Sequence, residues 1–410
     1  MSTLRTRLAQ ASTELKTFAA ASLVMGMSAS LIDSTLNNFL NENFDLTGFA
    51  RSFLEFPREM PGFLTMFVAA ALWFLCSRRQ GAFSMLLAAV GVLGIGLLSK
   101  SYAVMVVFLF ILSMGQHLSM PVASSLGMEL ARDGKTGQRL GQLNAIRNFA
   151  TILGSAVVFL GFRYLNFTFT VTFILAAAGY IIAAALMFSM KPTPVQKSTS
   201  KITLRKEYRL YYLLSVLYGS RKQLFLTFAP WVIVTIFHQP TQTLATLMTI
   251  GGVIGILFQP TLGWAVDRFG ERTILMLEAG MLILVCLAYG FARQILPENW
   301  AFILTCVCYL MDQMLMSVNM ARSTYMKKIA LKPEDVQPAL ASGVTIDHIF
   351  SISIAMLGGV IWNAFGYQYV FLMGAGIAVL NFFAARLVRV PDNVVIPAVE
   401  IAGLPQQLDE

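Results

Sequence analysis

Long apolar runs separated by short polar turns occupy almost the whole chain. Each run has about the length that a helix needs to cross a bilayer, which is roughly 20 residues. Twelve runs can be delimited, at residues 18–40, 51–76, 81–99, 102–127, 140–162, 168–190, 209–236, 243–264, 274–292, 301–322, 338–361 and 368–388. We therefore predict an all-α membrane protein with twelve transmembrane helices.

The longest polar interruption divides this pattern in the middle. Residues 191–207 begin Lys-Pro-Thr-Pro-Val-Gln-Lys-Ser-Thr-Ser-Lys, and a segment rich in Pro, Ser and Lys is typical of a flexible linker. We predict two pseudo-symmetric six-helix bundles, residues 18–190 and 208–390, joined by this linker. A short lead-in (1–17) precedes them and a tail (391–410) follows.

Composition and charge support a membrane protein and predict its orientation. Hydrophobic residues make up 57% of the chain and charged residues 12%, whereas soluble proteins carry about 25% charged residues. The net charge is +9, but the basic residues lie in turns and not in one patch, so no nucleic-acid partner is expected. Of the 30 Lys and Arg residues, 21 lie on the side of both termini, three on the opposite side and six inside spans. The positive-inside rule then places both termini in the cytoplasm, with the protein in the plasma (inner) membrane.

Several classes of chemistry are disfavoured. The four cysteines lie within or at the edges of apolar runs and are interpreted as small packing residues, so we expect no metal centre. The chain has no nucleotide-binding loop, and no nucleophile lies beside a base in the pattern an enzyme needs. We therefore predict neither an enzyme nor a bound cofactor.

One charged turn carries a recognisable pattern. Gly263-Trp-Ala-Val-Asp-Arg-Phe-Gly-Glu-Arg272 lies between two of the apolar runs. A turn this short forces its flanking helices to run antiparallel, and glycine allows close approach and a relaxed backbone there. The pattern G-x-x-x-D-R-x-G-x-R resembles the signature loop of the major facilitator superfamily.

The resemblance implies two six-helix halves that alternate access to a central site. It makes the turn a conformational gate formed by Gly263, Asp267, Arg268, Gly270 and Arg272. The corresponding first-half turn, Ser77-Arg78-Arg79-Gln80-Gly81, has lost the leading glycine (Phe74 stands there) and the aspartate (Arg78 stands there). That loss raises the question of whether the first-half gate closes through a charge.

Charged and polar side chains inside the spans are the candidate site, because a charge in a span is costly and usually faces a cavity, pairs or has a function. Arg221 lies about twelve residues into its span, close to the bilayer midplane at 1.5 Å per residue. A guanidinium there suits a carboxylate or phosphate. The predicted substrate ligands are Arg221, Lys222, Arg58, His117, Gln116 and Asp312. The alternative for the cations is a structural pair with an acid on a neighbouring helix.

Acids and one histidine are candidates for proton coupling, because the pKa of a carboxyl group responds to burial and to a neighbouring cation. The set is Asp33, Glu59, Asp312, Asp347 and His348. Glu59 belongs to a charged stripe with Arg51, Glu55 and Arg58 on the second span, for which an ion-pair ladder is the alternative. For Asp347 the alternative is a structural pair with Arg147, which lies opposite it in the internal repeat.

We hypothesise a secondary transporter that moves a small polar, anionic organic solute by alternating access, coupled to protons. Its expected partners are the solute, protons and the lipid bilayer, and it is expected to act as a monomer. One alternative is a multidrug or lipophilic-cation/proton antiporter, although residues 147–154 lack the Gly-Pro pattern that resembles drug antiporters. Another is a transport-incompetent receptor on the same fold.

Overall fold

The structure is a computed structural model that describes residues 12–44, 48–192, 204–239 and 241–390. The linker and both predicted end segments therefore lie largely outside the described residues. The first half contains α2 (Thr13–Asp33), α3 (Leu36–Phe44), α4 (Gly48–Ala71), α5 (Ser77–Leu98), α6 (Tyr102–Glu129), α7 (Thr136–Tyr164) and α8 (Phe169–Ser189). The second half contains α9 (Arg209–Trp231), α10 (Thr241–Ile295), α11 (Glu298–Met316), α12 (Asn319–Ile329), α13 (Val336–Phe365) and α14 (Tyr367–Arg386).

The twelve-span expectation is confirmed by these helices. Nine segments of the described chain are long and apolar enough to cross a membrane. One of them, Thr246–Ile295, bends at Gly270 and supplies two spans. The remaining two spans are α4 and α9, which are long enough but carry charges. Two spans are also interrupted, the first between α2 and α3 and the tenth between α11 and α12.

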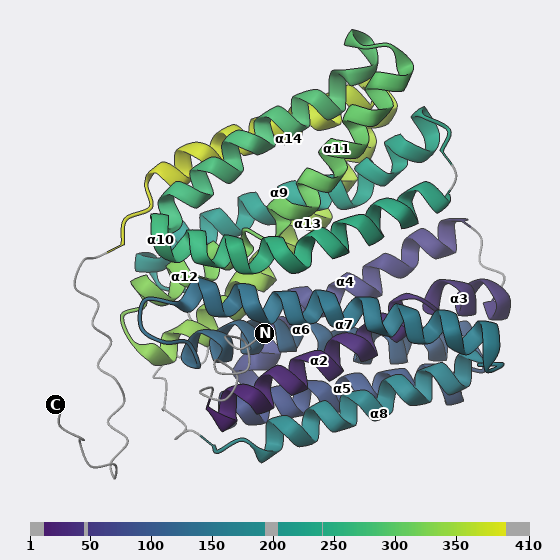
Figure 1. Cartoon of the computed structure of the whole chain (residues 1–410), viewed down its shortest axis with the longest axis vertical. Helices are drawn as coiled ribbons and strands as arrows, with labels where there is room; N and C mark the ends of the chain where they lie inside the picture. The colour runs from purple at the N-terminus through teal and green to yellow at the C-terminus, as the bar shows by residue number, and fades with distance from the viewer. Residues whose placement is uncertain (1–11, 45–47, 193–203, 240, 391–410) are drawn as a thin grey trace, which may run out of the picture.

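The helices lie in two stacked groups (Figure 1). Helices α2 to α8 occupy the lower group and α9 to α14 the upper group, with α10 packed on α7 where the groups meet. Helix α2 begins and α14 ends at the same, left-hand end, which we call the terminal face. Its turns are residues 72–76, 130–135 and 330–335, and α10 bends there at Gly270.

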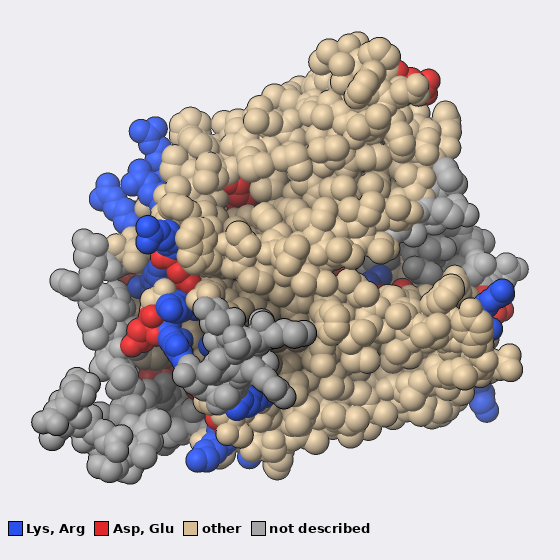
Figure 2. Space-filling model, viewed as in Figure 1, with Lys and Arg blue, Asp and Glu red and all other residues tan. Residues whose placement is uncertain are grey.

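Charged and apolar surfaces are separated as a membrane protein requires. Lys and Arg side chains gather at the terminal face, and the long flanks are almost free of charge in this view (Figure 2). Large apolar side chains project from those flanks, including Leu257, Leu284 and Phe159, each at least 65% exposed. Because the surrounding lipid tails are as apolar as these side chains, the exposed flanks need no protein partner.

Close helix contacts depend on glycine. At Gly91 of α5, an added Cβ atom would overlap the backbone of Leu112 in α6. Gly137 of α7 and Gly263 of α10 meet backbone to backbone in the same way across the two halves. Small residues permit this approach because packing and short polar contacts, rather than water exclusion, hold membrane helices together.

The apolar cores also show where the halves join. One core fills the first half around Val92, Leu112 and Tyr180, and another fills the second half around Phe225 and Phe371. A further core at the terminal face combines Met128 and Leu140 with side chains of the second half. The two halves are therefore held together most continuously at the terminal face.

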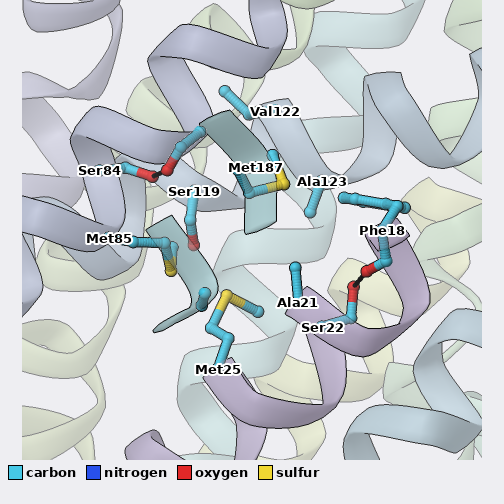
Figure 3. Close-up of a pocket in the computed structure, with 12 residues that line it drawn as sticks. Phe18, Ala21, Ser22, Met25, Ser84, Met85, Ser119, Val122, Ala123 and Met187 are labelled. Carbon is cyan, nitrogen blue, oxygen red and sulfur yellow. Dashed lines mark hydrogen bonds between the residues drawn. The ribbon is translucent and has the colours of Figure 1, made fainter. Parts of the chain in front are cut away.

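A small cavity remains inside the first half, between α2, α5, α6 and α8 (Figure 3). Its lining is apolar apart from Ser22, Ser84 and Ser119, whose hydroxyls donate to carbonyls of their own helices. No charged side chain lines it. This cavity therefore does not suit a polar solute.

Replacement of Gly91 and Gly280 by alanine separates packing from helix propensity. The Gly91→Ala variant should be less stable by about 1–3 kcal/mol, because the added methyl meets a backbone that cannot move freely. The Gly280→Ala variant should be more stable by about 0.5–1 kcal/mol, since no atom lies within 4 Å of its added Cβ and alanine is the better helix former. Thermal unfolding of the purified variants in detergent measures both. A shift in the same direction for both would contradict this account.

Candidate functional site

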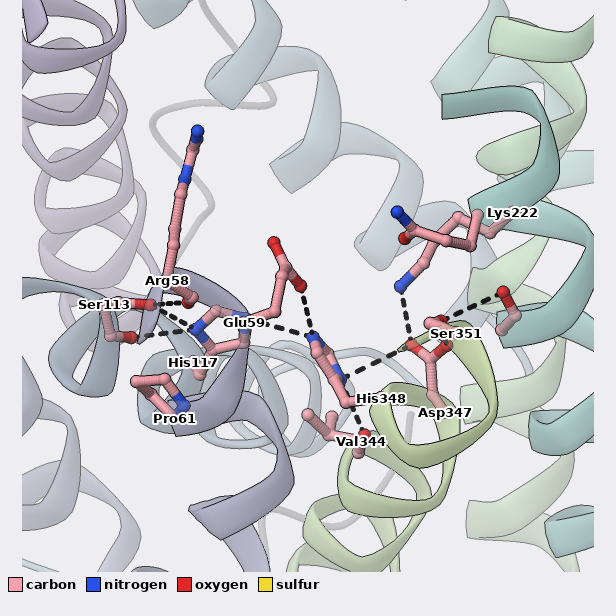
Figure 4. Close-up of polar contacts among 12 residues, drawn as sticks. Arg58, Glu59, Pro61, Ser113, His117, Lys222, Val344, Asp347, His348 and Ser351 are labelled. Atoms are coloured by element: carbon pink, nitrogen blue, oxygen red, sulfur yellow. Dashed lines mark hydrogen bonds and ion pairs between the residues drawn. The ribbon is translucent and has the colours of Figure 1, made fainter. Parts of the chain in front are cut away.

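Ionisable side chains from both halves meet at the contact between them (Figure 4). Helix α4 supplies Glu59, α6 supplies His117, α9 supplies Lys222, and α13 supplies Asp347 and His348. The sequence placed these five residues on four spans, and the fold brings them together. We call this group the interface cluster.

Two histidines form the centre of the interface cluster. The Nε2 atoms of His117 and His348 lie 3.1 Å apart, and their rings meet edge to face. A carboxylate oxygen of Glu59 lies 3.4 Å from the same His348 Nε2 atom. Gly62 makes this arrangement possible, because any side chain there would overlap the His348 ring.

Backbone carbonyl groups orient both rings. His117 Nδ1 lies 2.9 Å from the carbonyl oxygen of Ser113, one turn earlier on α6. His348 Nδ1 lies 2.8 Å from the carbonyl oxygen of Val344, one turn earlier on α13. The Ser113 hydroxyl donates to the carbonyl of Arg58, which ties α6 to α4. Each imidazole is therefore held by its own helix while its Nε2 atom faces the other half.

Lys222 and Asp347 form an ion pair beside the histidines, with 2.8 Å between Nζ and Oδ2. Asp347 also lies 3.1 Å from the Ser351 hydroxyl. Gly219 leaves space for this carboxylate, since an added Cβ would overlap it. In this structure Asp347 therefore pairs with Lys222 of its own half, and not with Arg147 across the halves.

A second polar group lies within the first half. Asp33 and Arg58 are 3.9 Å apart, and the Gln116 amide donates to the Tyr180 hydroxyl at 3.2 Å. The side chains of Arg51 and Glu55 lie outside the described residues. The predicted stripe on α4 is therefore seen only at Arg58 and Glu59.

Arg147 of α7 is the mid-span cation that the sequence did not assign to the site. It lies eleven residues after the start of α7, about 17 Å along the helix at 1.5 Å per residue. Its side chain is exposed and lies within range of a charge interaction with Tyr180. No acidic side chain among the described residues forms an ion pair with it. Its depth resembles that of Arg221, which lies twelve residues after the start of α9. The predicted span 140–162 began later than α7 does, so it placed Arg147 only seven residues from the end of its span.

Arg221 and Asp312 lie elsewhere, in a buried network inside the second half. Arg221 is 3.1 Å from Asp312 and 3.9 Å from Glu278, and Arg322 is 2.6 Å from Glu278. All four residues are at most 2% exposed. Two cations meet two acids, so the network neutralises itself. Its position inside one half favours the structural-pair alternative for Arg221. Glu278, a lone acid in an apolar run, was not predicted from the sequence.

The charged turn joins the halves at the terminal face. Asp267 accepts hydrogen bonds from the backbone N–H groups of Gly137 (2.8 Å) and Gln138 (2.7 Å) at the start of α7. A carboxylate is favoured there because the first N–H groups of a helix have no partner within it. Gly270 adopts φ 80°, which suits glycine. Arg268 and Arg272 are exposed.

The corresponding first-half turn makes its contact without a charge. The Ser77 hydroxyl donates to the Gln337 side chain, and the Gln337 amide donates to Gln80, each at 2.5 Å. Arg78, which replaces the aspartate, instead pairs within its own half with Glu14 (3.4 Å) and Glu129 (2.9 Å). This first-half turn therefore meets the start of α13 through neutral hydrogen bonds.

The buried network predicts a stability effect that distinguishes it from a substrate site. The Asp312→Asn variant should lose about 3–5 kcal/mol, because a buried arginine is left without its nearest acid. The double variant Arg221→Met/Asp312→Leu removes one cation and one acid together and keeps the Arg322–Glu278 pair, so it should recover most of that loss. Thermal unfolding in detergent measures both. If the single variants unfold at the same temperature as the unmodified protein but fail to bind solute, Arg221 would belong to the substrate site.

Comparison with known proteins agrees with this fold. The sequence profile of the Major Facilitator Superfamily matches residues 18–330 and 211–403. Among solved structures, a variant of the E. coli fucose:proton symporter FucP is similar with a TM-score of 0.73 and 17% identity, over 92% of this chain and 98% of that one.

Two further structures extend the comparison. The proton:xylose symporter XylE has a TM-score of 0.69 at 16% identity, over 92% of this chain and 95% of that one. The human organic anion transporter MFSD10 has a TM-score of 0.66 at 14% identity, over 91% and 100%. These likenesses concern the fold, whereas the profile match covers most of the sequence. The chain belongs to the major facilitator superfamily, as its charged turn and its two six-helix halves indicate.

Proposed function

We propose that this protein is a secondary active transporter that moves a small polar, anionic organic solute by alternating access, coupled to protons. The observation that carries the proposal is Arg147, an exposed guanidinium at mid-span without an ion-pair partner among the described residues. Because a charge that faced hydrocarbon would be costly, we assign it to the solute path. A guanidinium presents paired N–H donors that match a carboxylate or phosphate.

The charge balance explains why a proton would accompany the anion. The described side chains around the contact include three cations (Arg58, Arg147 and Lys222) and three acids (Asp33, Glu59 and Asp347). With neutral histidines this set is neutral. An anion entering it adds a negative charge in a region of low dielectric, and one proton restores the balance.

The proposed set of solute ligands therefore differs from the set that was predicted from the sequence. Arg147 would bind the anionic group, and Arg58 and Gln116 lie in the same half to contact the rest of the solute. Lys222 approaches from the other half. Arg221 and Asp312 are left out because they are buried and paired. We assign the proton to Asp33, because protonation would remove the negative charge that attracts Arg58, 3.9 Å away, when the anion enters.

The similar structures support the mechanism class. Two are named as proton symporters, for fucose and for xylose, and one as an organic anion transporter. In our proposal both termini face the cytoplasm of a plasma membrane, as the distribution of Lys and Arg indicates. The protein acts as a monomer, and the Asp267 contact closes the terminal face.

The first prediction tests the anion ligand. Arg147→Gln should lower the affinity for the bound solute by roughly 10- to 100-fold, because a hydrogen bond to a charged group is lost. The measurement is ligand-induced thermal stabilisation with a panel of carboxylates, phosphates, sugars and lipophilic cations at two pH values. Arg163→Gln, at the far end of the same helix, is the matched control and should bind normally. Stabilisation by lipophilic cations alone would make the protein an exporter, and no response to any solute would favour a transport-incompetent receptor.

The second prediction tests coupling. Asp33→Asn should still exchange solute down its gradient in proteoliposomes but should not accumulate it when a pH gradient is imposed, because the amide cannot carry the proton. Asp133→Asn, in an exposed turn of the terminal face, serves as the control and should accumulate solute. Normal accumulation by Asp33→Asn would exclude Asp33 as the proton carrier.

A further inference from the structure

We propose that Glu59, His117 and His348 form a binding site for one divalent transition-metal ion of the Zn²⁺ class. The ligand atoms are one carboxylate oxygen and the two Nε2 atoms, and all three lie within 4.8 Å of one another. The site goes beyond the proposed transport function. It bridges the halves, since α4 and α6 belong to one and α13 to the other.

The positions of the hydrogens on the two imidazole rings favour a cation between them. Each Nδ1 atom lies within hydrogen-bond distance of a backbone carbonyl oxygen, which only accepts. Both Nδ1 atoms must therefore carry the hydrogen, and in the neutral rings both Nε2 atoms hold a lone pair. Two lone pairs that face each other at 3.1 Å repel. A cation between them turns this repulsion into two bonds.

The spacing of the ligand atoms is also close to that of a zinc site. Zinc bonds of about 2.0–2.1 Å in tetrahedral geometry place neighbouring ligand atoms roughly 3.3–3.4 Å apart. Two of the three observed separations fit this geometry, at 3.1 Å between the two Nε2 atoms and 3.4 Å between His348 Nε2 and Glu59. The third pair, His117 Nε2 and Glu59, lies within 4.8 Å and would have to close when the ion binds. Two histidines and one carboxylate also leave a fourth position for water or for an anionic group of a solute.

Backbone carbonyl groups hold both histidine rings in the orientation that a metal ligand needs. Histidines that bind metal usually donate the second ring N–H to a carbonyl or carboxylate, which fixes the ring and directs the other nitrogen at the ion. Both rings have this support here. They are buried, at 7% and 3% exposure, and Gly62 leaves the space that the His348 ring fills.

The chemistry of the ligands indicates the class of ion. Imidazole nitrogen suits zinc, iron, copper and nickel, whereas calcium and magnesium prefer sites built of oxygen. The neighbouring charges are Lys222 and Asp347, which neutralise each other at 2.8 Å. Glu59 therefore supplies the negative charge that faces the ion. Because the ligands come from both halves, the site is complete only while the halves are in contact there.

The test uses the purified full-length protein, stripped with EDTA and titrated with Co²⁺ as a spectroscopic probe. We expect one Co²⁺ per chain, with the visible absorption of a four-coordinate ion, and competition by Zn²⁺. His117→Gln and His348→Gln should each weaken binding by at least the roughly 10- to 100-fold that loss of a supporting partner costs. The matched control is His238→Asn, because His238 is the remaining histidine of the three. Its φ of 50° is one that asparagine tolerates.

A second measurement needs no substitution and covers variants that fail to fold. X-ray absorption of the Zn²⁺-loaded protein should show two imidazole nitrogens and oxygen in the first coordination sphere. Sulfur ligands would place the ion at the cysteines and overturn the proposal. Unchanged affinity in both histidine variants would also overturn it. The proposal would also be overturned if no metal bound and the stability of the protein instead depended on pH through these two histidines. That result would assign a proton, and not a metal ion, to the space between the two Nε2 atoms.

Discussion

Charge compensation inside the membrane is the constraint on which the rest of this structure depends. Arg221 and Arg322 are almost fully buried, and such groups are stable only beside acids. Asp312 and Glu278 supply those acids from α11 and α10. The network therefore connects several helices of the second half and makes that half a self-neutral unit. A half organised in this way can move as one body, because these four buried charges do not depend on the other half.

The contact between the halves includes one charged and one neutral group of hydrogen bonds at the terminal face, whereas the four buried charges lie within the second half. At the terminal face, one contact uses the Asp267 carboxylate at the start of α7, and the other uses the neutral side chains of Ser77, Gln80 and Gln337. A charge-assisted hydrogen bond is roughly twice as strong as a neutral one. The two pseudo-equivalent contacts therefore differ in strength, and Arg78, which replaced the aspartate, stabilises its own half instead. The missing aspartate of the first-half turn is visible in the sequence, but the neutral hydrogen bonds that take its place are not.

Periodicity and charge predicted the fold well because both depend on single segments. Apolar length predicts a span, and α4 and α9 were recognised as spans despite their charges. Partner choice was less predictable, because it depends on how helices rotate against each other. Lys222 and Arg221 are neighbours in sequence, yet one faces Asp347 at the interface and the other faces Asp312 inside the half. A helix turns by about 100° per residue, so adjacent residues point into different environments. For this reason the sequence alone could not show that Arg221 pairs inside its own half while Lys222 lies at the contact between the halves.

The histidine pair extends the same reasoning. His117 and His348 lie 231 positions apart in sequence, and no spacing rule links them. The expectation of no metal centre was based on cysteine spacing, which says nothing about ligands that converge from distant spans. What joins the two rings is backbone geometry: each is fixed by the carbonyl one turn earlier, so each Nε2 lone pair points across the contact. Each ion pair joins a cation to an acid, so its two charges compensate each other. The histidines instead present two acceptors to each other, and this contact is favourable only when a cation is added between them.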